Sequence, residues 1–95
     1  MNLRDALNNL ASFNRDHALY VASKPVDLSS EVFICAVPED DSIPPEAAGT
    51  SLLIDVWHAS ETLRGLEQLL RIQVGRAPTQ DELFNRFILY LDNDA

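Results

Sequence analysis

The chain has 95 residues, of which 46% are hydrophobic, so it is long enough for one domain and too short for two. Its 15 acidic residues outnumber its 7 basic ones, and the resulting charge of −8 disfavours binding to nucleic acid or to anionic lipid. A single cysteine excludes an internal disulfide, and no apolar run approaches the roughly 20 residues of a membrane-spanning helix. We therefore expect one soluble, cytoplasmic domain over residues 1–95 that carries no secretory signal.

The N-terminal part of the chain predicts a helix followed by a short strand. Four apolar residues recur at the spacing of one helix face, and they are Leu3, Ala6, Leu7 and Leu10. Asn2 stands where a side chain can cap the first turn. Residues 18–22 then form a β-prone run, which ends before Lys24-Pro25 because proline cannot donate a hydrogen bond to a sheet.

Two further apolar runs predict strands. Residues 31–37 are almost continuously apolar, a pattern that favours a central strand covered on both faces. Cys35 lies in this run, and we expect it to be a buried, unreactive thiol. Residues 51–57 predict a third strand, which ends at Trp57.

The C-terminal part predicts two helices. Ser60 is placed to cap the first of them, and its apolar stripe consists of Leu63, Leu66, Leu69, Leu70 and Val74. Gly65 weakens this helix, and it also permits close packing. Gly75 is placed to end the helix. Thr79 and Glu82 match a capping box at the start of a last helix, which continues through Leu91.

The elements therefore follow one another in the order α-β-β-β-α-α. Spacers of this length permit an antiparallel meander with the helices gathered on one face. We expect an α+β fold, in which a small three-stranded, antiparallel sheet is covered by about three helices. The sequence does not determine the order of the strands in the sheet.

The sequence contains no motif that is typical of a catalytic or metal site, such as a glycine-rich phosphate loop or a His-Glu-x-x-His zinc motif. His17 and His58 have no spacing to Cys35 that favours a nucleophile and its base. The acidic runs 39–41 and 92–94 lack the length and the glycine of a calcium loop. We therefore expect no enzymatic activity, no cofactor and no metal.

Two features favour a surface that binds a protein partner, and the net negative charge favours a basic one. The connection over residues 38–50 is long, acidic and rich in proline, and connections of this length are often functional. Trp57 belongs to a residue type that is enriched in binding hot spots. The candidate partner-binding residues are Glu39, Asp40, Asp41, Glu46, Trp57, Asp92 and Asp94. A solvated surface for the acids, and a place at the edge of the core for Trp57, are the alternatives.

Several segments resemble a family of short, acidic, uncharacterised bacterial proteins. These segments are Ala18-Leu19-Tyr20, Cys35-Ala36-Val37-Pro38-Glu39-Asp40-Asp41, Asp81-Glu82-Leu83 and Tyr90-Leu91-Asp92-Asn93-Asp94-Ala95. The family ends in the signature YY-D-[HN]-D-A-F, and Leu91 departs from its aromatic pair. The resemblance implies a domain of unknown function. Similar small acidic proteins are often encoded beside bacterial toxins, where immunity proteins act by stoichiometric binding.

Two hypotheses about function follow. The first is a non-catalytic protein-binding module, such as an immunity or inhibitor protein that covers a basic surface of a toxin. The second is a homo-oligomeric structural or accessory protein. Mimicry of nucleic acid is less favoured, because four arginines in the C-terminal half offset the acids there, and they are Arg64, Arg71, Arg76 and Arg86.

Overall fold

The computed structural model describes residues 1–40 and 42–94, with side chains described up to residue 92. It confirms the α+β fold and the predicted order of helices and strands. The elements are α1 (Leu3–Asn8), η1 (Leu10–Ser12), β1 (His17–Val21), β2 (Val32–Ala36), η2 (Pro45–Ala47), β3 (Ser51–Asp55), α2 (Val56–Val74) and α3 (Gln80–Asp94).

The three strands form one antiparallel sheet in the order β2-β1-β3, so β1 is the central strand. The prediction that residues 31–37 form the central strand was therefore wrong. Four of the five residues of β1 are buried, whereas Phe33 in β2 keeps 39% of its surface exposed. The apolar pattern of a five-residue strand does not distinguish a central strand from an edge strand, because a loop can cover the apolar side chains of an edge strand.

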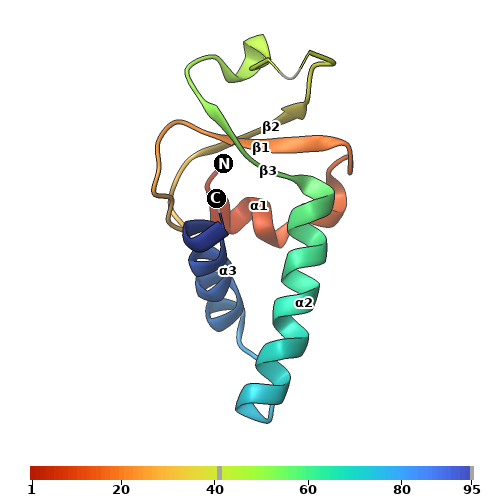
Figure 1. Ribbon diagram of the computed structural model, residues 1–95, viewed down its shortest axis with the longest axis vertical. Coiled ribbons are helices and arrows are strands. Elements are labelled where there is room, and N and C mark those ends of the chain that lie inside the picture. The colour runs from red at the N-terminus through yellow and green to blue at the C-terminus, as the bar shows by residue number, and fades with distance from the viewer. Residues whose placement is uncertain (41, 95) are drawn as a thin grey trace.

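The sheet separates two layers (Figure 1). The three helices lie on one face, and the connection between β2 and β3, which contains η2, lies on the other. Alternate residues of β1 serve the two layers: Leu19 and Val21 join the main core with the helices, while Ala18 and Tyr20 pack with Ala47 of η2. The helix α1 begins as predicted, since the Asn2 side chain accepts a hydrogen bond from the Asp5 backbone N–H at 2.8 Å.

The strand β3 passes directly into α2 without a loop. Ser60 was predicted to cap this helix, but the cap residue is Asp55, with φ −69° and ψ 150°, and Trp57 lies in the first turn. Val56 and Ala59 are buried on the main core, and this burial outweighs the preference of valine and tryptophan for strands. The first backbone N–H groups of a helix have no acceptor within the helix. Here the Trp57 N–H donates to the Arg15 carbonyl at 3.4 Å.

The helices α2 and α3 form a hairpin that extends away from the sheet (Figure 1). Gly75 ends α2 as predicted, with φ +80° and its N–H donating to the Arg71 carbonyl at 2.9 Å. The capping box at the start of α3 is also confirmed, with reciprocal hydrogen bonds between Thr79 and Glu82. The molecule is accordingly elongated, with extents of 45 × 23 × 22 Å.

Candidate functional site

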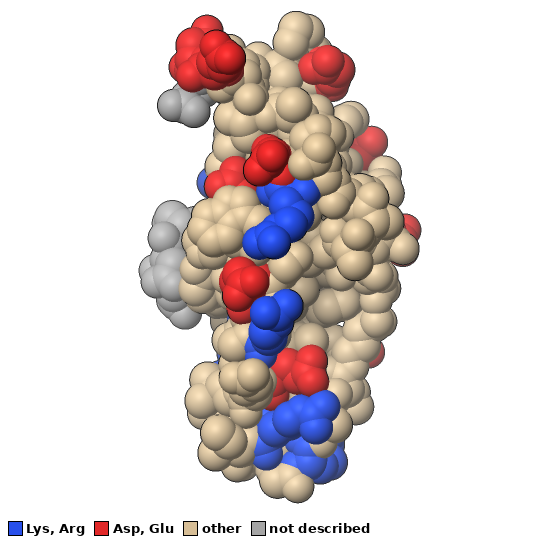
Figure 2. Space-filling model, turned by 90° about the vertical axis from the view of Figure 1, so that its right-hand side faces the viewer, with Lys and Arg blue, Asp and Glu red and all other residues tan. Residues whose placement is uncertain are grey.

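The negative charge is concentrated at the sheet end of the molecule. Residues 1–55 contain three basic and nine acidic side chains, whereas residues 56–95 contain four basic and six acidic ones. Figure 2 shows acidic groups at the sheet end and an alternation of acidic and basic groups down the face formed by α2. Within the hairpin, Glu61 pairs with Arg64, Glu67 with Arg71 and Glu82 with Arg76. The unbalanced charge therefore surrounds the sheet and its connections.

The acidic connection between β2 and β3 packs over one face of the sheet. Pro44 and Ala47 are buried there, while Glu39, Asp40 and Glu46 are exposed. Hydrogen bonds from the side chain and the backbone of Ser42 lower the pKa of the Asp40 carboxyl, which favours its charged form. Asp41, another candidate residue, lies outside the described residues.

Cys35 lies beneath this connection. It is half-buried, whereas the sequence predicted full burial. Burial raises the pKa of the Cys35 thiol, and the negative charge of Glu46 raises it further. Because the thiolate is the reactive form of cysteine, both effects reduce its reactivity at neutral pH.

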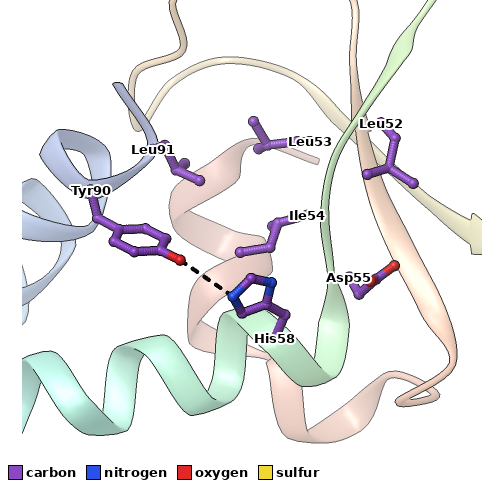
Figure 3. Close-up of a pocket in the computed structure, with 7 residues that line it drawn as sticks. All are labelled: Leu52, Leu53, Ile54, Asp55, His58, Tyr90 and Leu91. Atoms are coloured by element: carbon purple, nitrogen blue, oxygen red, sulfur yellow. Dashed lines mark hydrogen bonds between the residues drawn. The ribbon is translucent and has the colours of Figure 1, made fainter. Parts of the chain in front are cut away.

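An aromatic cluster lies on the other side of the sheet, at the start of α2. Trp57 keeps 46% of its surface exposed and stacks on His58, with ring centroids 5.4 Å apart and planes inclined by 23°. The phenolic oxygen of Tyr90 in α3 lies 3.3 Å from His58 Nε2 (Figure 3), and the Tyr90 ring stacks on the buried Phe87. An exposed tryptophan is thus supported from behind by rings from two helices.

Two residues of this cluster, His58 and Tyr90, also border a groove along the outer edge of β3. The groove has a volume of about 150 Å³ and is lined by Leu52, Leu53, Ile54, Asp55, His58, Tyr90 and Leu91. In Figure 3 Leu53 and Ile54 of β3 face Tyr90 and Leu91 of α3, while the side chains of Leu52 and Asp55 point to the other side of the strand. Its walls are mostly apolar, and the His58 ring and the Tyr90 hydroxyl are the polar side-chain groups that face it, whereas the Asp55 carboxylate points to the other side of β3 (Figure 3). This composition is typical of a site for an apolar group with a few polar contacts.

The structure separates the predicted partner-binding residues into two groups. Glu39, Asp40 and Glu46 lie with the connection on one face of the sheet, and Trp57 lies on the helix side. Asp92 is exposed in α3, one residue after Leu91 of the groove, while the side chain of Asp94 lies outside the described part of the chain. Sequence reasoning missed the groove because Tyr90 and His58 are 32 residues apart, and no local pattern predicts their contact.

The described residues contain no group of three or more histidine, cysteine or acidic side chains arranged to hold a metal ion. Across the same part of the chain, none of the helices combines the length and the apolar character needed to cross a membrane.

The fold and the site thus define a small α+β domain with an acidic sheet end and an exposed aromatic cluster. The chain belongs to a family defined by a domain of unknown function, DUF7716, whose model matches residues 1–95. This confirms the resemblance to an uncharacterised family, while the C-terminal signature stays a prediction. No curated protein and no solved structure matches the chain.

Proposed function

We propose that this protein is a non-catalytic protein-binding module that recognises a basic protein, with neutralisation of a toxin in the manner of an immunity protein as its most concrete form. The observation that carries the proposal is the exposed Trp57, which stacks on His58 at the border of an apolar groove. Binding hot spots are enriched in tryptophan that is held rigidly and surrounded by groups that exclude water.

The charge distribution supports a basic partner. The exposed carboxylates Glu39, Asp40 and Glu46 have no ion-pair partner among the described residues, whereas most acids of the hairpin are paired. Unpaired charges of one sign accelerate the encounter with a partner of the opposite sign, and salt screens this effect. We therefore assign two roles: Trp57 and the groove hold the partner, and the connection attracts it.

The proposal is tested by capture of proteins from an extract of the native cell, with the tagged protein as bait at low and at high salt. The expected result is a basic protein in a stoichiometric complex that Trp57→Ala abolishes and that Ile72→Ala, a change at an exposed residue of the hairpin, leaves intact. With the purified partner, reversal of Glu39, Asp40 and Glu46 to lysine should lower the association rate more than it raises the dissociation rate. Retention that is unaffected by Trp57→Ala and by salt would contradict the proposal.

Self-association is a second candidate function, and the tip of the hairpin favours it. Ile72 keeps 81% of its surface exposed, and Leu69 and Val74 nearby are each 43% exposed. Because the hairpin charges are largely paired, two copies repel each other least at this end. Light scattering over a range of concentrations should then detect a dimer that Ile72→Glu dissociates. Leu89→Glu, at an exposed leucine of α3, is the matched control, and a strictly monomeric wild-type protein would remove this candidate.

A further inference from the structure

The two edges of the sheet differ in how far the chain covers them. The outer edge of β2 is partly closed by the N-terminus, since the Val32 N–H donates to the Met1 carbonyl at 2.9 Å and Asn2 forms a bridge with Glu31. In the described part of the chain, no strand pairs with the outer edge of β3. An edge strand directs alternate N–H and C=O groups outward, where they can pair with an added strand.

The residues of β3 do little to oppose such pairing. Natural edge strands are commonly protected by proline, by charged side chains or by a bulge; the sequence of β3, Ser-Leu-Leu-Ile-Asp, contains no proline or lysine and carries one charge, at its last residue. The pairing of β1 with β3 shifts between Leu19 and Tyr20, so Leu53 is an additional residue opposite β1. Figure 3 shows the Leu53 side chain on the same side of β3 as Leu91.

An added strand would meet apolar surface on both of its faces. On the helix side, its side chains would enter the groove between β3 and Tyr90. On the opposite side lies Leu52, which pairs across the sheet with Tyr20 and keeps 40% of its surface exposed. Alternation of side chains between two faces is the property of an extended segment. The site therefore fits an extended segment better than it fits a helix.

The charge around the edge selects the occupant. Asp55 ends β3 with its carboxylate on the side of Leu52 (Figure 3), Asp92 is exposed one residue after Leu91 of the groove, and none of the described arginine or lysine side chains lines the groove. A second copy of this chain would bring another acidic sheet end against this one. A basic segment is attracted instead.

We infer that the outer edge of β3 is a strand-addition site, which takes an extended, basic segment of the partner with an apolar side chain in the groove lined by Tyr90 and Leu91. The inference rests on the proposed function and adds its mode of recognition. Backbone hydrogen bonds supply affinity in such complexes, and pockets for alternate side chains supply specificity.

The test uses a fluorescent peptide of about nine residues in which lysine and isoleucine alternate, a length that covers a strand with its flanks. Three control peptides are compared with it: one in which glutamate replaces lysine, one of identical composition with the residues in two blocks, and one with alternate backbone nitrogens methylated. Methylation removes the N–H groups on one edge of the peptide and leaves its charge unchanged. We expect the first peptide to bind most tightly and methylation to weaken it about tenfold or more, the effect of losing one or two hydrogen bonds.

Two measurements on the protein locate the binding. Amide hydrogen exchange should slow at residues 51–55 when the alternating peptide is added and should be unchanged at residues 32–36. Leu52→Lys should weaken binding, whereas Phe33→Lys should not. The control is closely matched, because both residues are cross-strand neighbours of Tyr20 and are 40% and 39% exposed.

The possible outcomes separate the two proposals. If basic peptides bind regardless of order and methylation, with no protection at residues 51–55, strand addition is wrong and the acidic binding module stands. If basic peptides bind no better than the glutamate peptide, both the mode of recognition and the basic partner are wrong.

Discussion

The phenolic oxygen of Tyr90 lies 3.3 Å from Nε2 of His58, and this contact connects α3 to the first turn of α2 next to the sheet. The Trp57 ring stacks on His58, and the buried Phe87 ring stacks on Tyr90. The contact therefore fixes both the wall of the groove and the ring beneath the exposed tryptophan.

Replacing Tyr90 by phenylalanine should lower the free energy of unfolding by about 0.5–1 kcal/mol, the net value of one accessible hydrogen bond. Tyr90→Ala should cost more, because it also removes the ring that packs on Phe87. Urea unfolding of Tyr90→Phe, His58→Ala and the double variant measures the coupling between the two side chains. Additive effects of the two changes would show that they do not interact.

The capping box at the start of α3 gives a second prediction. The Glu82 backbone N–H donates to Thr79 Oγ1 at 3.2 Å, so Thr79→Ala leaves this group without its side-chain acceptor. We expect a loss of roughly 1 kcal/mol in the free energy of unfolding. Thr79→Ser retains an acceptor and should lose much less. Equal losses in the two variants would show that the methyl group, and not the hydroxyl, is the stabilising feature.

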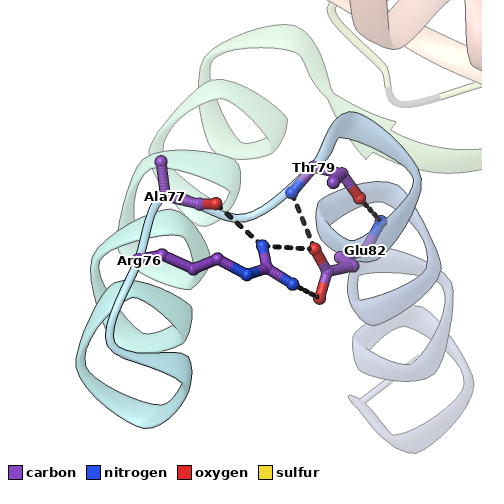
Figure 4. Close-up of polar contacts among 4 residues, drawn as sticks. All are labelled: Arg76, Ala77, Thr79 and Glu82. Carbon is purple, nitrogen blue, oxygen red and sulfur yellow. Dashed lines mark hydrogen bonds and ion pairs between the residues drawn. The ribbon is translucent and has the colours of Figure 1, made fainter.

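The Glu82 carboxylate predicts a dependence of stability on pH. Both its oxygens accept from Arg76, and one also accepts from the Thr79 N–H (Figure 4). The hydrogen bond from Arg76, followed by those with Thr79, lowers the pKa of Glu82 from 4.5 to about 2. The folded state therefore binds this proton less readily than the unfolded state, and the stabilising effect is complete above pH 4.5 and lost as the pH falls toward 2.

The check compares the urea midpoints of the wild type and Glu82→Gln between pH 7 and pH 2. The wild type should be more stable near neutral pH, and the difference should shrink as the pH approaches 2. A difference that stays constant over this range would mean that the charge of Glu82 does not stabilise the fold. Glu39→Gln is the control, because it removes an exposed carboxylate that has no ion-pair partner among the described residues.

Local chemistry accounts for the parts of the fold that the sequence predicted. Asn2, Gly75 and the pair Thr79 and Glu82 act within one helix turn, and each lies where its pattern indicated. The start of α2 and the central strand depend on burial by distant residues, and both predictions failed. Trp57 was named as a candidate residue with a place at the edge of the core as the alternative, and its exposure of 46% came only with the structure. The groove beside it needs α3 to fold back onto β3, which no local pattern shows.

The last prediction concerns Gly65 and tests whether close packing requires a glycine at this position. The sequence indicated that this glycine permits close packing, but it is exposed, and a methyl group added there would have no heavy atom within 4 Å. Gly65→Ala should therefore raise the free energy of unfolding by about 0.5–1 kcal/mol, because alanine favours the helix and restricts the unfolded chain. For a domain of this size, thermal unfolding should shift upward by about 2–8 °C. Gln68→Ala, at another exposed position of α2, controls for helix propensity, and a destabilised Gly65→Ala would mean that a second chain packs against this position in solution.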